Sequence, residues 1–143
     1  RLFRKAASEH AKGLERLVAV GRVYVGFAQR HPLYFEANVF HSTQEPNTDP
    51  ASFAARAERV GDEILQLVID ILGDGIRDGS IKSDIDPKQT AFMLWGALYG
   101  LVVTATFRKS LARFGQDPPG FLLSSLGFLS EAIGSDDRSH PSL

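Results

Sequence analysis

The side chains best suited to chemistry in this sequence are four histidines, His10, His31, His41 and His140, together with scattered carboxylates and hydroxyls. No two of these histidines are three or four residues apart, so their spacing predicts no metal site on a helix. The sequence has no nucleophile elbow, no phosphate-binding glycine loop and no paired acidic motif. The chain has 0 cysteines, which excludes disulfides and thiol chemistry. We therefore expect no catalytic residue, no metal, no cofactor and no enzyme activity.

A set of aromatic and aliphatic residues has the composition of a small-molecule pocket, which is usually apolar with a few polar groups. Trp95 and Tyr99 are four residues apart and share one face of a predicted helix, and the tyrosine hydroxyls would supply polar groups. The alternative is that these aromatics only fill the core, the more common use of an aromatic stripe. The candidate ligand-binding residues are Tyr24, Phe27, Phe35, Ile64, Val68, Ile71, Phe92, Trp95 and Tyr99.

A third pattern predicts contact between subunits. Gly96, Gly100 and Thr104 recur every four residues, and small residues at this spacing let two helices approach closely, although they could also only loosen a packed turn. The segments 87–110 and 118–134 are apolar on almost every side, so a monomer would expose large apolar patches. We expect a homodimer whose interface includes Gly96, Gly100, Thr104, Leu122, Leu126 and Leu129.

The elements that must position these residues are predicted to be helices, because apolar residues recur at intervals of three and four. The 143 residues fit one domain. Helices are predicted within 1–12 and over about 14–30, 32–40, 50–75, 87–110 and 118–134, with Gly79 as a left-handed C-cap. Asp-Pro pairs at 49–50, 86–87 and 117–118 would open three of them. The predicted fold class is all-α, a bundle of about six helices whose last two form a dimeric four-helix bundle.

Charge and hydropathy limit the partners of this chain. Lys and Arg number 16 and Asp and Glu 17, so the net charge of -1 gives no surface suited to a phosphate backbone. The longest apolar stretch, 91–107, is interrupted by Gly and Thr and is shorter than the ~20 residues of a bilayer span, so no membrane partner is expected. The absence of cysteine suits the cytoplasm, where we expect the protein. The chain begins with Arg1 and not Met, which predicts that a preceding segment is missing.

Two segments carry a resemblance to a known family. YVGFAQRHPLYFEANVF (24–40) and GDGIRDGSIKSDIDPKQTAFMLWGALYGLV (73–102), with their separation, resemble the C-terminal domain of TetR-like (tetracycline-repressor-like) bacterial transcription regulators, in the branch with a Trp-x-x-x-His-Gly signature. Tyr99 occupies the histidine position of that signature. The resemblance covers about 14–134. It implies a homodimer formed by the last two helices and a pocket for a small apolar or aromatic effector.

The resemblance also implies a domain organisation and a function. Residues 1–12 would end a helix that links to a missing N-terminal helix-turn-helix, 13–134 would bind the ligand and dimerise, and the polar residues 135–143 would be a disordered tail. The implied function is ligand-responsive regulation of transcription, expected to be repression, with operator DNA bound through the missing domain. The alternative is a stand-alone module that binds an apolar ligand or only dimerises, without binding DNA.

Overall fold

The three- and four-residue spacing of apolar side chains produces helices along nearly all of the chain. The computed structural model describes residues 1–33, 35–36, 49–107 and 109–135. Within these ranges no β-strand occurs, and the one ladder contact is an isolated antiparallel bridge between Ile81 and Gly134. The all-α prediction is confirmed. The helices are α1 (Leu2–Ser8), α2 (Gly13–Arg30), α4 (Phe53–Arg77), α5 (Pro87–Phe107), α6 (Ser110–Arg113) and α7 (Pro118–Ile133).

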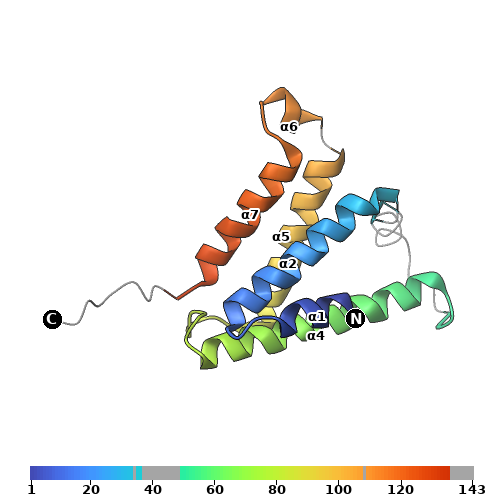
Figure 1. Cartoon of the computed structure of the whole chain (residues 1–143). Helices are drawn as coiled ribbons and strands as arrows, with labels where there is room; N and C mark the ends of the chain where they lie inside the picture. The colour runs from blue at the N-terminus through green and yellow to red at the C-terminus, as the bar shows by residue number, and fades with distance from the viewer. Residues whose placement is uncertain (34, 37–48, 108, 136–143) are drawn as a thin grey trace.

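Helix α2 is the centre of the arrangement, since it contacts α1, α4, α5 and α7. Figure 1 shows α4 along one edge of the molecule with α1 beside it, while α5 and α7 extend away from this edge toward α6, and α2 extends away from the edge in a different direction. A glycine allows the close approach of α7 to α2, because a Cβ at Gly21 would lie 2.9 Å from Cδ2 of Leu126. Helices α5 and α7, the two segments predicted to be apolar on almost every side, lie side by side.

The buried side chains form three groups, and their burial supplies the main favourable free energy of folding. The first core cluster joins α2, α5 and α7, the second joins α4 and α5 to the end of α7, and the third holds α1 against α2 and α4. Their buried members are Val25, Ala28, Phe35, Val102, Leu122 and Leu126 in the first, Leu65, Leu72, Ile81, Ala91 and Ile133 in the second, and Ala7, Val20 and Ile71 in the third.

Two of the three Asp-Pro pairs open helices as predicted. Asp86 Oδ1 accepts a hydrogen bond from Gln89 N at 2.7 Å at the start of α5, and Asp117 Oδ2 accepts one from Gly120 N at 2.8 Å at the start of α7. Proline suits the first turn in both because its missing N–H would have no partner there.

The prediction for Asp49-Pro50 was wrong, because α4 begins at Phe53. Ser52 caps this helix by accepting a hydrogen bond from Ala55 N at 3.1 Å. Asp49 Oδ1 accepts from Ala51 N at 2.9 Å, which forms a turn before the helix. Aspartate and serine both favour caps and turns. Here Asp49 forms the turn, and Ser52, three residues later, is the cap.

Other helix boundaries agree with the predictions to within a few residues. Helix α4 is followed by Gly79 with φ +79°, the predicted left-handed position. Helix α5 ends at Phe107, earlier than expected, and the short α6 was not predicted. Most of the helix predicted over 32–40 and residues 136–143 of the predicted tail lie outside the described residues.

The start of α2 and the end of α4 touch backbone to backbone. A Cβ at Gly13 would lie 2.3 Å from Cα and 2.4 Å from N of Gly75, closer than any side chain permits. Gly75 in turn faces Ile81, whose Cδ1 would be 2.4 Å from a Cβ on that glycine. Both positions therefore require glycine for close approach.

The backbone contact at Gly13 predicts an unfavourable Gly13→Ala substitution. We expect Gly13→Ala to lower the free energy of unfolding by about 1–3 kcal/mol through overpacking. Gly73→Ala is the matched control, because its Cβ would meet only Nη1 of Arg77 at 3.5 Å. In this helix interior it should raise stability by roughly 0.5–1 kcal/mol. Urea denaturation followed by circular dichroism measures both, and a Gly13→Ala variant as stable as the wild type would contradict the contact.

Candidate functional site

Three aromatic residues from different parts of the chain meet in the first core cluster. The ring of Phe35 lies between Tyr24 of α2, at 6.2 Å between centroids and edge-on, and Tyr99 of α5, at 5.6 Å. Phe35 is buried, and both tyrosines are partly buried. The structure thus brings together three of the nine candidate ligand-binding residues.

The tyrosine hydroxyls in this cluster are close enough to influence each other. Burial raises the pKa of Tyr24 from 10.0 to about 12, and a smaller rise comes from electrostatic repulsion by Tyr99. Both causes favour the neutral phenol. At neutral pH the Tyr24 hydroxyl is therefore neutral and can donate or accept a hydrogen bond within apolar surroundings.

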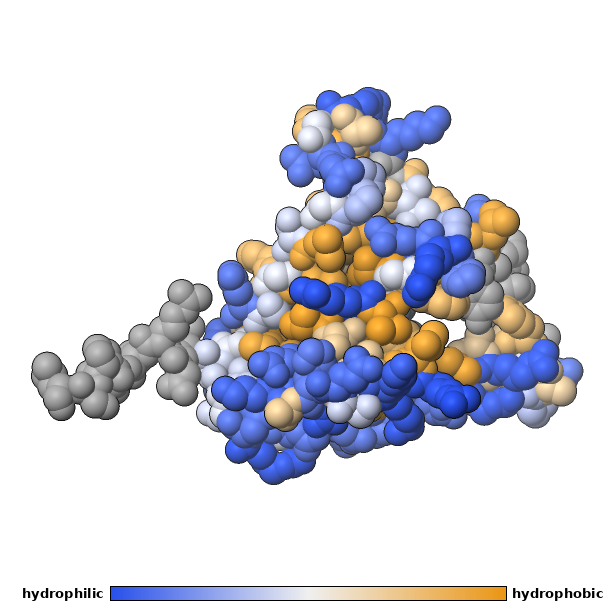
Figure 2. All heavy atoms as spheres, viewed as in Figure 1, coloured by the Kyte–Doolittle hydropathy of each residue, from blue (hydrophilic) through white to orange (hydrophobic). Residues whose placement is uncertain are grey.

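Trp95 marks a second part of the candidate site, where α5 meets α4. A Cβ at Gly61 would lie 2.9 Å from Cη2 of Trp95, so the indole packs directly on this glycine. The side chain keeps 38% of its surface exposed. On the face of the molecule seen in Figure 2, apolar residues lie at the centre. The same view shows an opening between the C-terminal part of α2 and the N-terminal part of α4.

The other candidate ligand-binding residues are dispersed. Phe27 packs against His31, with ring centroids 4.8 Å apart, and Phe92 is 63% exposed on α5. Val68 packs against the second and third core clusters. Ile71 is fully buried in the third, with Ala7 and Val20, and Ile64 is half-buried on α4.

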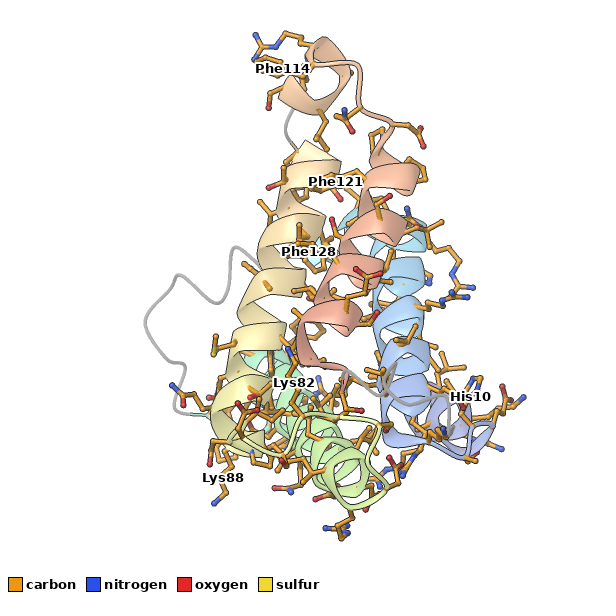
Figure 3. The ribbon with its side chains drawn as sticks, turned by 90° about the vertical axis from the view of Figure 1, so that its left-hand side faces the viewer. His10, Lys82, Lys88, Phe114, Phe121 and Phe128 are labelled. Carbon is orange, nitrogen blue, oxygen red and sulfur yellow. The ribbon has the colours of Figure 1, made fainter. Side chains whose placement is uncertain are left out.

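An apolar groove of about 930 Å³ runs between α5 and α7 on the outside of the molecule. Gly96 and Gly100 form part of its floor, because a Cβ at either position would meet no atom within 4 Å. Figure 3 shows Phe121 and Phe128 along the line between the two helices, with Phe114 beyond them toward α6. The groove is lined by Gly96, Ala97, Gly100, Leu101, Thr104, Gln116, Asp117, Gly120, Phe121, Ser124, Ser125, Phe128 and Leu129.

The residues predicted to form a subunit interface divide between this groove and the core. Gly96, Gly100, Thr104 and Leu129 line the groove. Leu122 and Leu126 lie instead in the first core cluster, where they are 2% and 8% exposed.

Phe121 and Phe128, which are not among the predicted interface residues, line the groove in place of the two buried leucines. Phe128 is 73% exposed, and Phe114 is 82% exposed beyond the groove. The seven-residue spacing of Phe121 and Phe128, about two turns of α7, was the available signal.

Two general properties of the described residues bear on function. Among them, α5 is the one helix long and apolar enough to cross a membrane, a test that core helices of soluble proteins also pass. Its contacts with α2, α4 and α7 place it within the bundle. No group of three or more histidines, aspartates or glutamates in the described ranges could hold a metal ion.

In this all-α domain, α5 contributes Tyr99 to the aromatic cluster and Gly96 and Gly100 to the outward apolar groove. The chain belongs to the tetracycline-repressor-like family, because residues 17–122 match the family described as "Tetracyclin repressor-like, C-terminal domain". Domains of this family are regulatory, and they typically dimerise and bind small-molecule effectors.

A solved structure shows the same fold at low sequence identity. It is described as "Structure of a protein with unknown function from Rhodococcus sp. RHA1", and it aligns with a TM-score of 0.67 at 15% identity. The alignment covers 94% of this chain and 66% of that protein, so this chain spans just under two thirds of its length. No curated protein matches the chain in sequence.

The raised pKa of Tyr24 predicts a loss of stability at alkaline pH. The folded protein keeps this proton up to about pH 12, whereas an unfolded chain loses it near pH 10.0. The stabilisation is therefore complete below the unfolded pKa and disappears as the pH rises through the folded pKa. We expect the free energy of unfolding of the wild type to fall relative to that of Tyr24→Phe across this window, as measured by urea denaturation at several pH values. Parallel curves for the two proteins would show that the Tyr24 hydroxyl is already solvated.

Proposed function

We propose that this chain is the effector-binding and dimerisation domain of a ligand-responsive transcription regulator that acts as a repressor in the cytoplasm. Residues 13–134 would form this domain, and 1–12 would lead from an N-terminal DNA-binding segment that precedes the sequence given. The observation that carries the proposal, besides family membership, is that α5 packs Trp95 on α4 and Tyr99 on Phe35, while its Gly96 and Gly100 face the outward groove.

The proposed effector site lies at the aromatic cluster between α2 and α5 and would extend toward α4, where Trp95 packs on Gly61. Phe35 and Trp95 offer apolar ring surface, and Tyr24 and Tyr99 add hydroxyl groups. Binding pockets for small molecules commonly combine these features. An apolar or aromatic effector with one or two polar groups would suit this site, because a charged group would find no opposite charge in the cluster to compensate its desolvation.

The proposed dimer would pair the α5–α7 groove of one protomer with the same surface of its partner. The exposed phenylalanines of this face would lose water on association, and the glycines would allow α5 of the partner to come close. A twofold interface uses the same patch on both subunits, so each groove would receive side chains from the other protomer. The result would be a four-helix bundle of two α5 and two α7 helices.

The groove predicts that Gly100→Leu weakens the dimer. The added side chain would enter a packed seam at two symmetry-related places, at a cost of about 1–3 kcal/mol each, so dissociation should become at least ~30-fold easier. Gly127→Leu is the control, since Gly127 is also exposed on α7 with no atom near its Cβ but does not line the groove. Sedimentation equilibrium should give a weakened dimer only for Gly100→Leu. Equal association of the two variants would place the interface elsewhere.

The function itself is tested on the intact native protein. Selection from random duplex DNA should recover one palindromic sequence, and an effector found by its effect on Trp95 fluorescence should weaken DNA binding about 5–150-fold, the usual size of such coupling. Trp95 is the 1 tryptophan of this chain, so any further tryptophan in a preceding segment should be replaced first. An intact protein without sequence-specific DNA binding would leave the alternative of a stand-alone ligand-binding or dimerisation module.

A further inference from the structure

Helix α2 is capped by residues far away in the sequence. Its N-cap residue, Lys12, makes no side-chain cap. Instead, Gly13 N–H donates a hydrogen bond to Asp78 Oδ2 at 2.7 Å, and Leu14 N–H donates one to Ser80 Oγ at 3.0 Å. Helix starts are usually capped by the residue that immediately precedes them. The first turn of α2 therefore depends on the turn between α4 and α5, residues 78–86, which we call the α4–α5 turn.

An ion pair connects the first turn of α2 to the last turns of α4, just before the α4–α5 turn. Arg16 Nη1 lies 2.6 Å from Asp74 Oδ2, and Asp74 also pairs with Arg77. Hydrogen bonding from Arg16 is the main reason that the pKa of Asp74 lies below its usual value, so the carboxylate stays ionised. Beneath these side chains lies the direct backbone contact of Gly13 with Gly75. The first turn of α2 is thus fixed to the last turn of α4.

The α4–α5 turn is also tied to the end of α7. Lys82 N donates to Ile133 O at 3.0 Å, and Ser135 N donates to Ser80 O at 3.1 Å. The ammonium group of Lys82 donates to Ala132 O at 2.9 Å, and Figure 3 shows this lysine at the lower end of α7. The turn therefore connects α4 and the start of α2 to one of the helices that line the groove.

Helix α1 meets α2 at this same corner. Residues 9–12 join the two helices and are exposed. Ala7 of α1 is buried against Val20 and Ile71 in the third core cluster, and Phe3 is partly buried against the same cluster. The orientation of α1 is therefore set by this apolar contact on one side and by the position of Gly13 on the other.

We propose that the α4–α5 turn is a coupling element, in which Asp78 and Ser80 are positioning residues that fix the direction of α1 relative to α2. A displacement of α4 against α5 would then move α1 with it. This rests on the proposed function, in which α4 borders the effector site at Gly61 and α1 leads to the DNA-binding segment. The inference concerns the chain alone, so it can be tested without effector or DNA.

Spin labels can measure the direction of α1, and the absence of cysteine in this sequence allows two labels to be placed cleanly. We would label Arg4→Cys on α1 and Gln29→Cys on α2, both exposed, and add excess unlabelled chain so that only distances within one protomer are recorded. Pulsed electron paramagnetic resonance should give one narrow distance in the wild-type background. In Asp78→Ala/Ser80→Ala the distance distribution should broaden and shift.

A matched control separates this positioning role from a general loss of stability. Asp86→Ala removes a local cap at the other end of the same turn, the hydrogen bond from Gln89 N, and should leave the α1–α2 distance narrow. The proposal fails if the double-alanine variant keeps the wild-type distribution or if Asp86→Ala broadens it equally. If circular dichroism shows that the double variant does not fold, the two single substitutions at Ser80 replace it. Ser80→Ala should then broaden the α1–α2 distance, whereas Ser80→Thr, which keeps the hydroxyl, should not. Equal distance distributions for these two variants would also overturn the proposal.

Transmission of a displacement along α4 is tested by adding a large side chain near the other end of this helix. A side chain on Gly61 would strike Trp95, so Gly61→Leu should push α4 away from α5. With the turn intact, this substitution should shift the α1–α2 distance. In the double-alanine background it should have no further effect, which makes the four proteins a double-mutant cycle. No shift with the intact turn, or the same shift in both backgrounds, would overturn the coupling while leaving the proposed regulatory function to its own tests.

Discussion

The fold is organised around one constraint, which is that α5 has almost no polar side. Its residues are apolar around the whole circumference, so water must be excluded from several directions at once. Helices α2 and α4 cover it from within the protomer, and α7 lies along another side. The remaining side carries Gly96 and Gly100 and stays uncovered in the single chain. Burial of one helix thus determines both the internal core and the outward groove.

The sequence predicted those parts of the structure that depend on local pattern. The helical spacing, the Asp-Pro starts of α5 and α7 and the left-handed Gly79 all follow from residues close together in the chain. The inward direction of Leu122 and Leu126 could not be predicted, because a helix that is apolar on every side gives no signal about which face is covered. The aromatic contacts of Tyr24 and Tyr99 through Phe35 were suspected from composition, but only tertiary packing shows that they meet.

The likeness to the Rhodococcus protein shows how little sequence this fold requires. At 15% identity, the two chains share an arrangement that reaches a TM-score of 0.67. Such tolerance is expected when the structure depends on where apolar residues recur, because many combinations of aliphatic side chains fill the same volume. Close contacts are less tolerant. The glycine pair at positions 13 and 75 leaves no room for any side chain, so this corner is more restricted than the core around it.

The long-range capping of α2 also has a consequence for synthesis. Asp78 lies 65 positions after the backbone amide that it caps. At a translation rate of about 5–20 residues per second, Gly13 is added to the chain roughly 3–13 s before its capping carboxylate. Until the later segments have been made, the apolar face of α2 has no α4, α5 or α7 to pack against. The native first turn of α2 therefore forms only after more than half of this sequence has been synthesised.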